Sequence, residues 1–307
     1  MTNSIKFLTA MMRRDISSKA GFVAVVGRPN AGKSTLVNAL VKERIALVSH
    51  KAGATRRRQL AIVQSANAQI ILIDTPGFDK REKELNKFMQ KEIVKSIEEA
   101  DLALLIIDMA DSVSSYINLL EIIGDIPHII ALTKMDNFTH DERLVKLAAF
   151  QAYSDRFLAI VPISAKQNDY LALLDEIVKH LPCHDYYYDP EYLTTATIKE
   201  IYKEMIREAI FDCFSDELPY SSDVMIDNFE ESETIDRISA IVYVEKPSQK
   251  AIVIGKDGAG IKRLGISARK IIEAFAQKKI YLKLRVAVLD NWSKDATMLN
   301  KLGYSHI

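Results

Sequence analysis

Short apolar runs alternate with longer amphipathic stretches from Phe22 to His180. The apolar runs read FVAVV, QLAIV, QIILI, LALLIID, HIIAL and LAIVPI, and helical patterns follow most of them. This alternation is typical of a doubly wound sheet with helices on both faces. A brief polar link around Asn67 joins QLAIV to QIILI and is too short for a crossover helix, so we predict an antiparallel hairpin there. The pattern predicts an α/β domain with a six-stranded, mostly parallel sheet.

The pattern changes after Leu181. PCHDYYYDPEYLT has two prolines, several aromatics and no period, which predicts a linker. Residues 196–214 then read as a helix, DVMIDNFE and ISAIVYVEK as strands, IGKDGAGIKRLGISARKIIEAFAQK as two helices and IYLKLRVAVL as a closing strand. The length of 307 residues fits two domains. We expect an N-terminal extension at residues 1–19 and an α/β domain at residues 20–182. A linker at residues 183–194 then leads to a smaller α+β domain at residues 195–307.

Composition changes this picture little. The chain is 48% hydrophobic and 27% charged, with equal numbers of basic and acidic residues, 41 of each, which is ordinary for a globular protein. No run approaches the roughly 20 apolar residues that cross a bilayer, and residues 13–15 (RRD) end the N-terminal apolar patch early. Cys183 and Cys213 lack metal-ligand spacing, so we expect reduced thiols and a cytoplasmic location.

A glycine-rich segment follows the first apolar run. Residues 27–34 read GRPNAGKS and match G-x-x-x-x-G-K-[ST], directly before an amphipathic helix. Glycines let backbone amides wrap phosphates, and a helix N-terminus favours anions. The alternative is a plain glycine-containing turn, which the flanking strand and helix disfavour. We therefore predict a phosphate-binding loop in which Lys33 reaches the outer phosphates and Ser34 binds magnesium. The predicted phosphate-binding residues are Gly27, Arg28, Pro29, Asn30, Ala31, Gly32, Lys33, Ser34 and Thr35.

Two segments after later apolar runs indicate that the base is guanine. Residues 133–136 (TKMD) follow HIIAL, and the Asp136 carboxylate can accept hydrogen bonds from guanine N1 and N2, which adenine cannot supply. Residues 164–166 (SAK) follow LAIVPI and place a backbone amide near the guanine oxygen. The predicted base site consists of Thr133, Lys134, Asp136, Ser164, Ala165 and Lys166.

Two more segments are expected to respond to the terminal phosphate. Residues 74–77 (DTPG) follow QIILI, so Asp74 can hold Mg²⁺ through water and the Gly77 amide can sense the phosphate. Residues 49–60 (SHKAGATRRRQL) are the predicted first switch, in which Thr55 resembles the threonine that completes magnesium coordination only with GTP. The alternative is a solvated basic loop, because three consecutive arginines follow Thr55.

Four of these segments, residues 27–34, 74–77, 133–136 and 164–166 in chain order, resemble the motifs of the translation-factor-related GTPases, whose guanine motif usually reads N-K-x-D. Thr133 replaces the Asn, and its hydroxyl can still brace the phosphate loop. Phe78 stands where many small GTPases carry a water-orienting glutamine. In several family members with such a replacement, an Asn in the phosphate loop recruits K⁺, and Asn30 matches that Asn. The alternative is that Asn30 only caps the loop. We expect hydrolysis that is slow unaided and stimulated by potassium, RNA or both.

The second domain carries a candidate RNA site. Residues 254–258 (IGKDG) lie between two helical patterns and match the G-x-x-G loop that clamps about four nucleotides in KH domains. The alternative is a solvated basic helix face, which the glycine loop and its placement disfavour. The predicted RNA-binding residues are Ile254, Gly255, Lys256, Asp257, Gly258, Lys262 and Arg263.

Local charge supports an RNA partner although the net charge is zero. The segment 250–285 contains only two acidic residues but many basic ones. The basic residues are Lys250, Lys256, Lys262, Arg263, Arg269, Lys270, Lys278, Lys279, Lys283 and Arg285. The preceding stretch is acidic, with Asp212, Asp216, Glu217, Asp223, Asp227, Glu230, Glu231, Glu233 and Asp236. The neutral total therefore hides a polarised domain.

A GTPase unit followed by a type II KH unit resembles the Era family of bacterial GTPases over about residues 20–304. Matching stretches are GFVAVVGRPNAGKSTLVNAL, KAGATRRR, IDTPGF, ELPYS and LKLRVAVLDNWSKDATMLNKLGY. The resemblance implies GTP or GDP with Mg²⁺ as ligands and binding of the 3′ end of 16S ribosomal RNA by the KH domain. It also implies assistance in 30S subunit maturation and peripheral association with the inner membrane, with no DNA partner.

Two other functions stay open from the sequence. An RNA-binding assembly factor with a structural, barely hydrolysed nucleotide is compatible with Phe78. A tRNA-modifying GTPase is a third candidate, but the chain lacks a terminal cysteine motif and a folate-type domain, and the KH loop would be unexplained.

Overall fold

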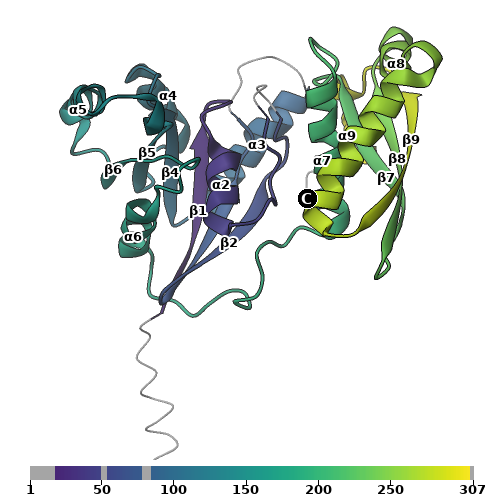
Figure 1. The fold of residues 1–307 in the computed structure, drawn as a ribbon. Coiled ribbons are helices and arrows are strands. Elements are labelled where there is room, and N and C mark those ends of the chain that lie inside the picture. The colour runs from purple at the N-terminus through teal and green to yellow at the C-terminus, as the bar shows by residue number, and fades with distance from the viewer. Residues whose placement is uncertain (1–17, 50–53, 78–83, 305–307) are drawn as a thin grey trace, which may run out of the picture.

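The computed structural model describes residues 18–49, 54–77 and 84–304, which form two lobes with a sheet in each (Figure 1). The first sheet has the order β2-β3-β1-β4-β5-β6. β2 and β3 pair antiparallel and the other neighbours pair parallel, which confirms the predicted hairpin and the mostly parallel sheet. The strands are β1 (Lys19–Gly27), β2 (Gln59–Ser65), β3 (Ala68–Asp74), β4 (Leu102–Asp108), β5 (His128–Thr133) and β6 (Ala159–Pro162).

Helices cover both faces of this sheet, which is why its inner strands read as unbroken apolar runs. Along β1, Val23 and Val25 face a core completed by α2 and α6, while Ala24 and Val26 face a core that includes α3 and α4. The helices are α2 (Lys33–Val41), α3 (Glu84–Glu98), α4 (Ser114–Ile123), α5 (His140–Ala149) and α6 (Leu171–His180), and a short 3-10 helix, η1 (Met135–Asn137), follows β5. None of the described helices is both long and apolar enough to cross a bilayer.

The second sheet has three strands in the order β7-β8-β9. β7 (Ser222–Glu230) pairs antiparallel with β8 (Ile235–Val244), and β8 pairs parallel with β9 (Lys279–Val288). The parallel pair needs a crossover, which α8 (Pro247–Ile254), the 3-10 turn η3 (Lys256–Gly258) and α9 (Ala259–Ala276) supply. Helix α7 (Ile198–Cys213) packs with α9 against one face, so buried and more exposed residues alternate along β8.

One helix prediction in this domain is wrong. The sequence predicts two helices in the segment 254–278, but after Ile254, the last residue of α8, this segment holds the short 3-10 turn η3 and a single α-helix, α9. Gly265 lies within α9 without interrupting it. A lone glycine costs a helix only about 1 kcal/mol relative to alanine, and the burial of Leu264, Ala268 and Ile272 outweighs that cost.

The segment between the lobes lies against the edge of the first sheet. Gln69 Nε2 donates to the Tyr188 carbonyl at 2.8 Å, and its Oε1 accepts from the Tyr187 and Tyr188 amides at 2.9 and 3.0 Å. Further along, Thr194 Oγ1 donates to the Leu60 carbonyl at 2.6 Å. The connection is therefore hydrogen-bonded first to β3 and then to β2, and it packs along the β2-β3 hairpin.

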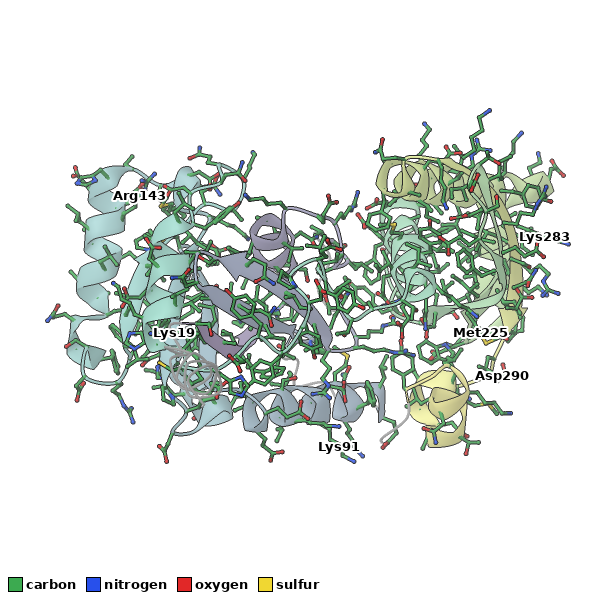
Figure 2. The ribbon with its side chains drawn as sticks, turned by 90° about the horizontal axis from the view of Figure 1, so that it is seen from below. Lys19, Lys91, Arg143, Met225, Lys283 and Asp290 are labelled. Atoms are coloured by element: carbon green, nitrogen blue, oxygen red, sulfur yellow. The ribbon has the colours of Figure 1, made fainter. Side chains whose placement is uncertain are left out.

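The C-terminal residues return to the first lobe. Helix η4 (Trp292–Lys294) and helix α10 (Ala296–Lys301) bury an apolar cluster against Leu85, Phe88 and Met89 of α3. Figure 2 shows the molecule from below, with Lys91 labelled on α3 and Asp290 labelled just before the C-terminal helices. In this view the C-terminal helix lies beside one end of α3. Apolar periodicity did not reveal α10 because the helix has only six residues.

Trp292 should be a major stabiliser of this junction. Its side chain is fully buried, its indole Nε1 donates to the Ser221 carbonyl at 3.1 Å, and its ring stacks on Tyr304. We expect Trp292→Ala to lower the free energy of unfolding by about 3–5 kcal/mol, measured by urea titration with circular dichroism. Tyr281→Ala, at an aromatic that is 55% exposed, should cost less than about 1 kcal/mol, and equal losses would contradict this account.

Candidate nucleotide site and RNA loop

The loop between β1 and α2 has the geometry of an anion cradle. A Cβ at Gly27 would lie 2.5 Å from the Ile106 carbonyl oxygen, so only glycine fits there. Gly32 has a φ of +98°, and Asn30, a residue type that tolerates the left-handed region, has a φ of +62°. The loop leads directly into the N-terminus of α2, where backbone amides are available to an anion.

Lys33 reaches back over this loop. Its Nζ donates to the Gly27 and Arg28 carbonyls, both at 3.0 Å. Burial lowers the pKa of the Lys33 ammonium to about 8, although the Asp74 carboxylate opposes the shift. A buried ammonium held by neutral carbonyls is costly, and the charge of a phosphate would offset that cost.

Three oxygen-bearing side chains meet at the start of α2. Ser34 Oγ donates to Asp74 Oδ2 at 2.9 Å and lies 3.1 Å from Thr55 Oγ1. Asp74 is fully buried and its Oδ1 has no hydrogen-bond partner. Burial raises the pKa of Asp74 to about 6, despite the opposing charge of Lys33 and the bond from Ser34. Oxygen ligands and a buried carboxylate oxygen without a donor fit a hard divalent cation such as Mg²⁺.

The base end is fixed to the phosphate loop. Thr133 Oγ1 donates to the Ala31 carbonyl at 2.6 Å, so the hydroxyl makes the bracing contact expected of it. Lys134 Nζ donates to the Asn30 carbonyl at 2.9 Å and pairs with Asp108 Oδ2 at 2.6 Å. These contacts bind β5 and the turn that follows it to the loop after β1.

A second contact orients the carboxylate predicted to read the base. Ser164 Oγ donates to Asp136 Oδ1 at 2.8 Å. Asp136 lies in η1 directly after β5, and Ser164 follows β6. The serine therefore serves the predicted base site by holding Asp136 in place.

The predicted nucleotide residues meet in one cavity of about 450 Å³. Its walls include Pro29, Asn30, Gly32, Lys33, Ser34, Thr35, Thr55, Gly77, Thr133, Lys134, Asp136, Ala165 and Lys166. Five predicted residues do not line the cavity but form hydrogen bonds with residues that do: Gly27, Arg28, Ala31, Asp74 and Ser164.

Sequence reasoning missed other parts of the cavity. Leu47, Val48 and Asn137 line it, and Asp108 holds Lys134 from outside. Asp108 had a usable signal, because a carboxylate at the end of an apolar strand run faces the same sheet edge. Leu47 and Val48 carry no such chemical signal. Phe78, and residues 50–53 of the predicted switch, lie outside the described residues.

The predicted RNA loop is an exposed turn between α8 and α9. Gly255 and Gly258 have φ values of +72° and +79°, and a Cβ at Gly255 would lie 2.7 Å from the Gly260 amide nitrogen. Lys256, Asp257 and Lys262 are exposed. The glycines thus present an open backbone with two lysines beside it, as phosphate contact requires.

Some of the predicted basic residues already have partners within the domain. Arg263 is exposed, and its Nη2 donates to the Cys213 carbonyl at 3.0 Å. Lys278 pairs with Asp236 at 2.8 Å, and Arg285 pairs with Asp227. The acidic and basic stretches are therefore partly neutralised by each other.

The guanine assignment can be tested at Asp136. We expect Asp136→Asn to weaken GTP binding by at least about 100-fold and to move preference toward xanthine nucleotides, because the amide complements the xanthine base. Binding of fluorescent GDP and XDP measures this directly. Glu121→Gln, an exposed position on α4, is a control expected to bind like the wild type. Unchanged GTP affinity in Asp136→Asn would overturn the assignment.

Comparisons with known proteins agree with these two units. Residues 22–134 match the family described as 50S ribosome-binding GTPase, and residues 217–293 match the KH domain. The chain is 45% identical over 284 residues to the GTPase Era of Campylobacter fetus subsp. fetus (strain 82-40), covering 92% of this chain and 98% of the relative. It is 46% identical over 297 residues to that of Helicobacter pylori (strain P12), covering 95% and 98%.

Solved structures of the same kind share the whole architecture. An Aquifex aeolicus Era variant bound to GDP.AlF4- superposes with a TM-score of 0.88 at 30% identity, over 94% of this chain and 100% of that one. Era in complex with MgGDPNP and nucleotides 1506–1542 of 16S ribosomal RNA gives 0.89 at 30% identity, with the same coverage. With its GTPase domain, its KH domain and this identity over nearly its full length, the chain belongs to the Era family of GTP-hydrolysing enzymes.

Proposed function

We propose that this GTPase binds the 3′ end of 16S ribosomal RNA through its KH loop and assists maturation of the 30S subunit. The observation that carries the proposal is the exposed turn at Gly255–Gly258, with Lys256 and Lys262 beside it, in a chain that also holds a nucleotide cavity. Support comes from the relative solved with a 16S ribosomal RNA segment, which shares the fold over 94% of this chain. Peripheral contact with the inner membrane stays a prediction of the family resemblance.

The cavity residues divide into three proposed roles. The loop of residues 27–35 and Gly77 bind the phosphates, and the Lys33 ammonium neutralises their charge. Ser34, Thr55 and, through water, Asp74 hold Mg²⁺, which when bound withdraws charge from the phosphates. Asp136 reads the guanine edge, assisted by Ser164, and the remaining base-site residues complete the pocket.

The domain division is proposed to have functional meaning. Residues 20–182 hold and hydrolyse the nucleotide, residues 195–307 hold RNA, and residues 183–194 connect them. GTP favours an arrangement in which the KH loop holds RNA, and hydrolysis favours release. Because linkage is reciprocal, RNA must tighten GTP binding by the same factor.

Potassium dependence is expected if Asn30 recruits the ion. Turnover of GTP should then be faster in potassium than in sodium buffer, and Asn30→Gly, which preserves the positive φ, should remove the difference. Phosphate release at matched ionic strength measures both. Equal turnover of the wild type in the two buffers would contradict a potassium role for Asn30. Absence of turnover in every buffer would favour the alternative function, an assembly factor with a structural nucleotide.

RNA binding by the loop predicts a specific charge dependence. Lys256→Glu with Lys262→Glu should weaken binding of the 16S 3′ segment by more than about tenfold and lower the salt slope by about 2, since two phosphate contacts are lost. GTP hydrolysis without RNA should stay unchanged, because both lysines lie in the KH domain. Lys199→Glu, an exposed lysine on α7, is the matched control. Equal weakening by Lys199→Glu would show that only overall charge matters.

A further inference from the structure

The second domain holds the segment that carries Thr55. On one side of Thr55, the Ala54 carbonyl accepts a hydrogen bond from Arg207 Nη2 at 2.9 Å. On the other side, the Arg56 guanidinium, 2% exposed, donates to three backbone carbonyls, two in the turn before β7 and one at the first residue of β7. These carbonyls, at 3.1, 2.9 and 2.8 Å, belong to Pro219, Tyr220 and Ser222.

The next arginine is held by the C-terminal residues. Arg57 Nη2 donates to the Leu302 carbonyl at 2.6 Å, and its guanidinium lies 4.4 Å from the centre of the Tyr304 ring. Arg58 differs, because it pairs with Glu99 and, at 3.9 Å, with Glu92, both within the first domain. Two adjacent arginines therefore attach the same segment to different domains.

Ion pairs hold the Arg207 guanidinium in position to donate to the Ala54 carbonyl. It lies on α7, is 2% exposed, and pairs with Glu204 at 2.7 Å and with Asp223 at 3.4 Å. Asp223 is itself buried, 3.7 Å from Lys203 and 4.0 Å from Arg56. A guanidinium fixed by two carboxylates loses little freedom when it binds a further carbonyl, so the bond to Ala54 is preorganised.

An apolar contact supports the same attachment. Leu47 and Ala54, from either side of the undescribed residues 50–53, share a small buried cluster with Phe211 of α7. Phe211 lies one helical turn beyond Arg207. Side chains of one helix thus contact both ends of the segment around the nucleotide cavity.

We propose that Arg207 is a positioning residue of the GTPase site: by binding the Ala54 carbonyl, it holds the Thr55 hydroxyl at the metal corner formed by Ser34 and Asp74. The inference rests on the role proposed above for Thr55. Its consequence is that the second domain completes the nucleotide site, so movement of that domain changes how well the site distinguishes GTP from GDP. A threonine that binds the metal only with GTP affects that discrimination and leaves GDP binding alone.

The test compares two affinities in the full-length protein. Arg207→Lys retains the positive charge beside Asp223 and Glu204 but loses the planar fork. We expect Mg²⁺-dependent binding of a non-hydrolysable GTP analogue to weaken by about tenfold, the loss of one charge-assisted hydrogen bond, while Mg²⁺·GDP binding changes by less than about twofold. Equal weakening of both nucleotides, or no weakening, would overturn the proposal.

Matched variants keep the test decisive. Arg57→Gln, at a less buried side chain, should lower analogue binding selectively even if Arg207→Lys folds poorly, whereas Lys199→Gln, at an exposed lysine of α7, should bind both nucleotides like the wild type. Equal effects of these two variants would contradict attachment to the second domain. Thr55→Ala separates the metal-binding role of Thr55 from the positioning role of Arg207. If Thr55→Ala leaves the discrimination between GTP and GDP unchanged, the role of Thr55 is wrong. If Thr55→Ala lowers that discrimination and Arg207→Lys does not, the role of Arg207 is wrong.

Discussion

The burial of Lys33 at the start of α2 and of Asp74 at the end of β3 is the constraint on which the rest of this structure depends. β1 and β3 pair in register, with Val25 opposite Asp74, so the phosphate loop and the carboxylate must meet at one edge of the sheet. Burial disfavours the charge of both side chains and shifts both pKa values toward neutrality. The magnesium nucleotide that we propose for this site would supply the anion and the cation that these groups lack. The first domain thus carries a charge arrangement that is costly by itself and favourable with ligand.

This constraint extends into the second domain through Thr55. The Thr55 hydroxyl, 3.1 Å from Ser34 Oγ, and the arginine that follows it are separated by a single peptide unit, yet Arg56 is buried among carbonyls of the other domain. A change in the position of Thr55 must therefore change the contacts that join the domains. Because Arg56, Lys203 and Arg207 surround the buried Asp223, loss of one cation would leave an undercompensated carboxylate. Such a network favours discrete arrangements over gradual deformation, as a switch requires.

Much of the fold and of the nucleotide site followed from local pattern. The antiparallel hairpin was predictable because the link at Asn67 is too short for a helix, and the strand order placed the motif residues at one edge. The segment after Gly258 forms one helix, α9, because burial of Leu264 and Ile272 outweighs the small cost of Gly265 within that helix. The bonds from Arg207 to Ala54 and from Arg57 to Leu302 join residues 153 and 245 positions apart, so no local pattern could indicate them.

Steady-state GTP hydrolysis in potassium buffer, with and without RNA that spans the 3′ end of 16S ribosomal RNA, tests the central claim most directly. A switch that joins the two domains through the Thr55 segment predicts that this RNA raises the turnover rate, because RNA favours the domain arrangement in which the metal corner is complete. Turnover that is the same with and without saturating RNA would show two independent sites and would contradict the account.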